Sequence, residues 1–186
     1  MQLMEVLRSR RAVRNFSSQP VSQSVLEELI QAAVLAPSAM NRQPWAFAVS
    51  IDVTFIETMA AEAKSFVLEH FPRSGPEAEL RSMIENADYE IFHHAPALIL
   101  IFATSGAAQD AEDCCLAAQN LMLAARDKGI GSCWIGLARP WLSQPATMEK
   151  LNLPLNYRIV APIILGYPAE WPESHGRREP VIHWIG

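Results

Sequence analysis

Arginine side chains near both ends of the sequence could together hold an anionic ligand. Arg10 and Arg14 lie four positions apart in the segment RSRRAVRNF, and Arg177 and Arg178 lie near the other end. If the first segment is helical, Arg10 and Arg14 point to one face, where paired guanidinium donors can bind one phosphate. The same spacing also fits a solvated basic helix end, which the helix dipole favours. Spacing alone leaves both interpretations open.

Two loops carry groups that could contact a bound ligand. The loop APSAMNRQPWAF, residues 36–47, displays a serine, an asparagine and a glutamine between two apolar segments. The segment GIGSCWIG, residues 129–136, is rich in glycine, but its glycines follow a helix and lead into a strand. A phosphate-binding loop has the reverse order, so we interpret these glycines as a helix end and a tight turn. The backbone amides of residues 134–137 could still face a ligand.

Other kinds of catalytic site are poorly supported. The five histidines lack metal or nucleophile spacing, and no Gly-x-Ser-x-Gly segment is present. The histidine pair at positions 93 and 94, just before an apolar run, is interpreted as structural. Anion-binding arginines and an amide-rich apolar loop, without an acid, base or nucleophile cluster, favour a cofactor that performs the reaction itself.

Composition sets the class of protein. The 186 residues, half of them hydrophobic, are sufficient for one core, so we expect a single domain over residues 1–186. The net charge of −5 and the scattered basic residues argue against a nucleic-acid partner. No apolar run reaches the roughly 18 residues of a membrane span. Three cysteines, of which Cys114 and Cys115 are adjacent, fit neither a metal site nor a disulfide framework. We therefore expect a soluble cytoplasmic protein with reduced cysteines.

Helical periodicity occurs in several segments. One short helix opens the chain, and a second follows with Ser24 and Glu27 as its capping box and Pro37 as its end. The region 52–94 reads as two helices. Their expected capping pairs are Thr54 with Glu57 and Ser74 with Glu77. A long helix is predicted over 110–128, stopped by Gly129, and a short one over 143–151.

The remaining apolar segments predict strands. These are an alternating strand from Trp45 to Ile51, a fully buried strand within 96–103, and a short strand after Gly131. The last strand, YRIVAPIILGYP, contains Pro162, which favours a bulge or an edge position. The tail from residue 169 onward has little periodicity and must wrap around another surface or stay loose. Helices around a few strands predict an α+β fold in which helices cover a sheet.

Four motifs taken together resemble the FMN-dependent nitroreductase family. They are RRAVRNF at 10–16, the loop APSAMNRQPWAF, QNLMLAARDKGIGSCWIG at 119–136, and GYP followed by the basic GRREP. The resemblance implies a nitroreductase-like α/β sandwich, with a mostly antiparallel central sheet covered by helices. It also implies a homodimer with FMN at the subunit interface and a C-terminal tail extending onto the partner.

The resemblance also implies an activity. Hydride would pass from NADH or NADPH, by a ping-pong cycle, to a nitroaromatic, quinone or enone acceptor. Relatives of this fold include dehalogenating, desaturating and flavin-fragmenting enzymes, and a flavin-binding protein without turnover is a further alternative. The flavin performs the chemistry, so no catalytic side chain and no metal ligand is assigned.

The resemblance assigns cofactor-binding roles to individual residues. Arg10 and Arg178 would hold the FMN phosphate, and the amide of Gly136 would point at flavin N5. Arg11 and Arg14 would lie near the phosphate, ribityl or ring oxygens. Ala12 stands where the family commonly has serine, so one hydroxyl contact is missing. The full expected set is Arg10, Arg11, Ala12, Arg14, Pro37, Ser38, Asn41, Trp134, Ile135, Gly136 and Arg178. Ser38 and Asn41 would reach into the flavin site, Trp134 and Ile135 would flank the ring system, and nothing in 52–94 matches a family motif.

Overall fold

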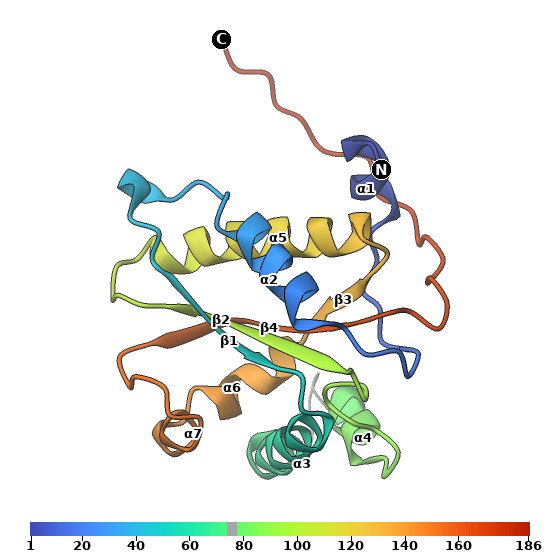
Figure 1. The fold of residues 1–186 in the computed structure, drawn as a ribbon, viewed down its shortest axis with the longest axis vertical. Coiled ribbons are helices and arrows are strands. Elements are labelled where there is room, and N and C mark those ends of the chain that lie inside the picture. The colour runs from blue at the N-terminus through green and yellow to red at the C-terminus, as the bar shows by residue number, and fades with distance from the viewer. Residues whose placement is uncertain (74–77) are drawn as a thin grey trace.

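Four strands form one antiparallel sheet in the order β1-β2-β4-β3 (Figure 1). The computed structural model describes residues 1–73 and 78–186, without the side chain of residue 78. The strands are β1 (Trp45–Ser50), β2 (Ala97–Ala103), β3 (Gly131–Trp134) and β4 (Arg158–Gly166). The helices are α1 (Leu3–Ser9), α2 (Gln23–Ala33), α3 (Val53–His70), α4 (Ala78–Glu85), α5 (Asp110–Asp127), α6 (Arg139–Leu142) and α7 (Pro145–Lys150). Two 3₁₀ turns lie at Ala39–Asn41 and Gly136–Ala138.

Helices cover both faces of the sheet, with α1, α2 and α5 on one side and α3, α4, α6 and α7 on the other (Figure 1). Strand β2 is buried throughout, as its uninterrupted apolar sequence predicts. Its alternate residues enter different layers: Ile99 and Ile101 pack in the cluster under α2 and α5, whereas Leu98 and Phe102 pack in the cluster with α3. The expected α+β architecture follows from this two-sided burial.

Strand β4 is central, so the expectation of an edge position at Pro162 is wrong. The expected bulge does occur in this strand, because the register shifts between Ile101 and Phe102 and leaves Val160 unpaired. The carbonyl of Pro162 accepts a hydrogen bond from the Ile135 amide at 2.8 Å, just beyond the end of β3. In an antiparallel ladder the N–H and C=O of one residue point to the same neighbouring strand, which for Pro162 is the β3 side. Proline has no N–H to donate, and β3 has already ended opposite Pro162, so no hydrogen bond within β3 is lost.

Two helix starts differ from their expected capping pairs. Ser22, not Ser24, caps α2, because its hydroxyl accepts the Val25 amide. Asp52, not Thr54, caps α3, because its carboxylate accepts the Phe55 amide at 3.0 Å. In both cases the residue two positions before the expected one is also a favourable N-cap, and it is the residue that caps the helix. The expected pair Ser74 and Glu77 lies outside the described residues.

The ends of three helices bear on the site. Helix α2 ends at Ala33, before Pro37. Helix α5 ends at Asp127, and Gly129 with φ of 74° provides the left-handed residue that follows it. Helix α1 ends at Ser9, and Arg10 is already extended. Arg10 and Arg14 therefore do not share a helical face, and that interpretation of their spacing is wrong.

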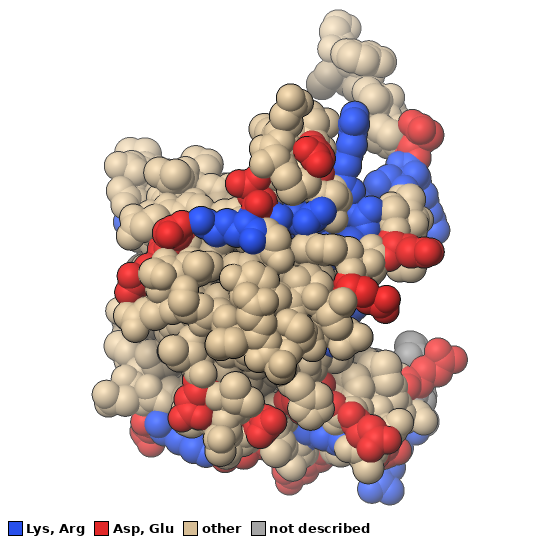
Figure 2. Space-filling model, turned by 45° about the vertical axis from the view of Figure 1, so that its right-hand side comes forward, with Lys and Arg blue, Asp and Glu red and all other residues tan. Residues whose placement is uncertain are grey.

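The chain ends in an exposed tail that leaves the body of the molecule beside α1 (Figure 1). Trp171 still touches the body, because the Arg126 guanidinium lies 3.9 Å from its ring centre. Figure 2 shows lysine and arginine side chains gathered in the upper part of one face, above a broad area without charged side chains. Among the residues that the structure describes, no helix is both long enough and apolar enough to cross a membrane.

Candidate functional site

The segment 10–16 lies beside β3 as an extended chain, which explains why helix α1 stops. Val13 is fully buried, and its amide donates to the Ser132 carbonyl at 3.1 Å. Its side chain occupies the space where a Cβ on Gly131 would lie, so a glycine in β3 permits this close approach. Phe16 pairs in turn with Pro168. The first and last sequence motifs therefore lie side by side, although they are at opposite ends of the sequence.

A pocket of about 530 Å³ opens next to this segment. Arg14 contributes its positive charge, and the chain after β3 contributes Trp134, Ile135, Gly136 and Leu137. The rest of the lining consists of Leu80, Met83, Tyr89 and His93. A mostly apolar cleft with few polar groups is the usual form of a small-molecule site.

The amide of Gly136 is an available hydrogen-bond donor in this pocket. Gly136 begins a 3₁₀ turn, so its N–H has no acceptor within the turn. Within residues 1–73 and 78–186, no acceptor for it is found, and the residue is exposed. The neighbouring amide of Ile135 is already bonded to Pro162. Gly136 therefore lines the pocket between Ile135 and Leu137, and its N–H has no acceptor among the described residues.

His93 is neutral at physiological pH in this setting. Burial, and then the nearby charges of Arg14 and His94, lower the pKa of His93 from 6.5 to about 4. Burial raises the pKa of the Tyr89 phenol, which meets the His93 ring edge-on with centroids 5.7 Å apart. His93 also has a left-handed backbone, with φ of 54°. Such conformations are uncommon outside glycine and are enriched at functional sites. At neutral pH, Arg14 is thus the positively charged side chain among the described residues that line the pocket.

The second group of expected site residues lies in the loop after α2. Ser38 Oγ accepts the Gln43 amide at 2.9 Å, and Asn41 Oδ1 accepts the Gln43 side-chain amide at 3.2 Å. The polar groups that the loop displays are therefore partly bonded to one another within the loop. The Ser38 hydroxyl proton and the Asn41 amide protons are the donors that remain.

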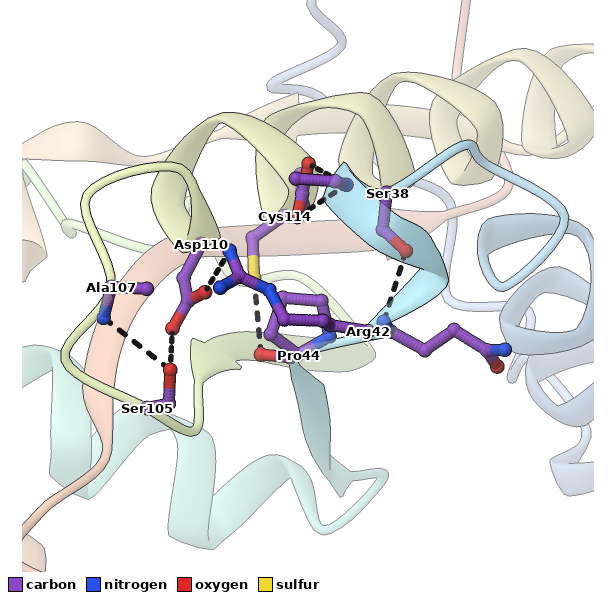
Figure 3. A network of polar contacts seen from close by, with 10 residues as sticks. Ser38, Arg42, Pro44, Ser105, Ala107, Asp110 and Cys114 are labelled. Atoms are coloured by element: carbon purple, nitrogen blue, oxygen red, sulfur yellow. Dashed lines mark hydrogen bonds and ion pairs between the residues drawn. The ribbon is translucent and has the colours of Figure 1, made fainter.

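The first turns of α5 hold this loop in place (Figure 3). Both carboxylate oxygens of Asp113 accept the Ala39 amide at 3.1 Å. The Arg42 guanidinium lies 3.6 Å from the buried Asp110 carboxylate, which also accepts the Ser105 hydroxyl. Cys114 lies below the loop, where burial, followed by the Asp110 charge, raises its thiol pKa to about 12. Its neutral S–H is directed at the Pro44 and Phe102 carbonyls, so we interpret this cysteine as structural.

Comparison with known proteins identifies the family. The model of the Nitroreductase family matches residues 7–167. The chain belongs to the nitroreductase family. A relative from Archaeoglobus fulgidus, provisionally named an NADH dehydrogenase/NAD(P)H nitroreductase, is 32% identical over 167 residues, which cover 90% of this chain and 86% of the relative.

Solved structures confirm the nitroreductase-like fold. One neighbour is a nitroreductase with bound FMN from Bacteroides fragilis, with a TM-score of 0.85, 23% identity and full coverage of both chains. Another is an iodotyrosine deiodinase bound to FMN and 3-iodo-L-tyrosine, with a TM-score of 0.75, 26% identity and full coverage of both chains. Nitroreductase-family members thus share this architecture while their names point to different reactions.

Within one chain of this nitroreductase-family protein, the expected site residues form two separate groups. Arg14, Trp134, Ile135 and Gly136 line the pocket. The loop that carries Ser38 and Asn41 is bonded to Asp113 near the start of α5, whereas Ser9, next to Arg10, bonds to Arg126 near its end. Asp113 and Arg126 are thirteen positions apart in α5, a distance of about 20 Å along the helix axis.

The other expected residues lie around these two groups. Arg11 folds back onto the Arg8 and Arg10 carbonyls, and its buried Nε has no partner among the described residues. Ala12 is exposed and bridges to Ser132. Pro37 is exposed beside Ser38, and Arg178 is exposed in the tail.

Four pocket residues were not expected from the sequence: Leu80, Met83, Tyr89 and His93. Their region matches no family motif, so neither resemblance nor spacing singled them out. The histidine pair at 93 and 94 was the one sequence feature that could have pointed to this part of the pocket, but histidines just before a buried strand are usually structural.

Proposed function

We propose that this nitroreductase-family protein is an FMN-dependent oxidoreductase that transfers hydride from NADH or NADPH to nitroaromatic, quinone or enone acceptors. The observation that carries the proposal is the pocket where Arg14 and the unpaired Gly136 amide meet the apolar surfaces of Trp134 and Ile135. A flat, largely apolar ring system with hydrogen-bond acceptors on its edge fits such a cleft.

The residues present fit a flavin. The Gly136 amide can donate to a ring nitrogen, and Arg14 can neutralise negative charge on a ring or ribityl oxygen. Arg10 lies at the start of the same extended segment, half-buried beside Arg11, and is suited to the phosphate. When bound, FMN would supply the hydride chemistry. The chain's own groups would orient the ring, shield it from water through Trp134, and balance its charge.

We infer a homodimer because the loop with Ser38 and Asn41 is bonded near the start of α5, whereas Arg10 follows Ser9, which is bonded near the end of α5. A second copy can bring its Ser38–Asn41 loop to the first copy's pocket. Helix α1 supports such an interface, since Leu3, Met4 and Leu7 are exposed on it. The tail also exposes apolar side chains, including Trp184 and Ile185, which the body of a partner could cover. Three free cysteines among the described residues suit a reducing cytoplasm, where we infer that the protein acts.

The phosphate assignment is tested by removing its two arginines separately. Arg10→Ala and Arg178→Ala should each weaken FMN binding by about 10- to 100-fold, because one charge-assisted contact contributes about 1.5–3 kcal/mol. Arg177→Ala is the matched control, since this neighbouring arginine is bonded to the adjacent Gly176 carbonyl. Equilibrium dialysis of apo-protein against FMN measures the affinity. Unchanged affinity in both variants would mean that the phosphate binds elsewhere.

A second candidate reaction is reductive dehalogenation of an aromatic amino acid. A pocket of about 350 Å³ adjoins the first and shares Arg14, Tyr89 and His93 with it. It adds the carboxylates of Asp88 and Glu90, so it offers both signs of charge to a zwitterion. An acceptor panel separates the candidates: we expect NAD(P)H oxidation with nitroaromatics or quinones, whereas iodide release from iodotyrosine would favour the second.

A further inference from the structure

We propose that Asp113 is a positioning residue, which holds the loop 38–43 in the conformation that presents Ser38 and Asn41 to FMN. The inference rests on the proposed function, because it assigns a purpose to the loop only if FMN binds there. Asp113 itself would not contact the cofactor. It would act through the Ala39 amide.

The loop has an unfavourable backbone and therefore needs to be held. Met40, Asn41 and Gln43 all have left-handed conformations, with φ of 55°, 53° and 51°. Most residues other than glycine and asparagine avoid this region, because Cβ crowds the neighbouring carbonyl. Three such residues within four positions persist only where the surrounding structure stabilises them. Met40 is 93% exposed, so packing of its own side chain does not provide that stabilisation.

Asp113 provides a tie between this loop and the body of the protein. The residue is 5% exposed, and its carboxylate accepts the Ala39 amide with both oxygens at 3.1 Å. A buried carboxylate requires donors, so the tie satisfies both partners. An acidic residue near a helix start often bonds to its own helix, but Asp113 bonds to a residue 74 positions away. The contact therefore fixes the loop rather than the helix.

The contact between Asp113 and the Ala39 amide lies next to Ser38 and Asn41, the two side chains that would donate to FMN. Ser38 immediately precedes Ala39, and its carbonyl accepts the Asn41 amide at 2.9 Å. A fixed Ala39 amide thus holds the turn from Ser38 to Asn41, and with it the two side chains at the ends of this turn. Release of the tie would let the left-handed residues relax and would spread Ser38 and Asn41 over many positions.

The test measures FMN affinity of the full-length apo-protein by equilibrium dialysis, alongside its melting temperature. Asp113→Ala should weaken FMN binding by about 10- to 100-fold, the range for a hydrogen bond to a charged group. Asp113→Asn keeps the size and one acceptor oxygen, so it should lose less. Asp52→Ala is the matched control, because its carboxylate also accepts one backbone amide, at 3.0 Å, but far from the loop. It should lower the melting temperature without changing FMN affinity.

A rescue variant separates positioning from general destabilisation. Met40→Gly in the Asp113→Ala background removes one strained left-handed residue and should recover about fivefold of the lost affinity. Equal FMN affinity in wild type, Asp113→Ala and Asp52→Ala would overturn the proposal, as would an equal loss of FMN affinity in Asp113→Ala and Asp52→Ala. Failure of the wild-type protein itself to bind FMN would instead overturn the proposed function, and this inference with it.

Discussion

Replacement of Gly131 by alanine should disturb the fold and the candidate site together. A methyl group at this position would lie 2.7 Å from Val13 Cβ, 2.7 Å from its Cγ1 and 2.8 Å from its Cγ2. Carbon atoms prefer separations of about 3.5–4.0 Å, so Val13 must move. Val13 is fully buried and its amide is bonded to Ser132, which means that it cannot move without breaking contacts.

The expected cost follows from overpacking of a closed core. Forcing an extra methyl group into such a site typically costs about 1–3 kcal/mol. A loss of about 2 kcal/mol should lower the melting temperature of a domain of this size by about 4–8 °C. Arg14 follows Val13 directly and lines the pocket, so FMN affinity should fall as well.

Gly106→Ala is the matched control for this experiment. Nothing lies within 4 Å of a Cβ at Gly106, so its replacement should change stability by no more than about 0.5 kcal/mol. Thermal melts followed by circular dichroism, with and without FMN, measure both effects. Equal melting temperatures for the two variants would refute the packing of segment 10–16 against β3.

Two further predictions concern a helix cap and a titrating group. Ser22→Ala should destabilise the protein by about 1 kcal/mol in urea unfolding, because it removes the α2 cap, whereas Ser24→Ala should cost less. The folded pKa of His93, about 4, lies below its ordinary 6.5, so the unfolded chain binds this proton first and stability should fall as the pH drops from about 6.5 towards 4. His93→Asn should remove about 1–2 kcal/mol of that loss between pH 7.5 and pH 4.5, after allowance for partial exposure, which urea unfolding at the two pH values measures.

The elements that could be predicted from sequence are those with an unambiguous local signal. Strand β2 follows from seven apolar residues in a row. Helix α5 follows from its length and from Gly129, whose left-handed conformation matches its role as a helix stop. The family motifs, in order along the chain, also predicted the fold class.

Features that depend on distant partners could not be predicted in the same way. The stretch from Arg10 to Arg14 is extended because Val13 packs on Gly131, a contact between residues more than a hundred positions apart. The central place of Pro162 depends on where β3 ends, which no local pattern records. Likewise, the Ser38 hydroxyl accepts the Gln43 amide in a loop that is bonded to Asp113, 74 positions away from Ala39 in the sequence.

The most direct test of the central claim is an anaerobic absorbance titration of the protein reconstituted with FMN. NADH and NADPH are added separately in small steps, and the flavin absorption is followed. We expect protein-bound flavin whose visible bands bleach at about one equivalent of at least one donor, because a hydride carries two electrons. Bands that persist with both donors, or a protein that retains no FMN, would contradict the account.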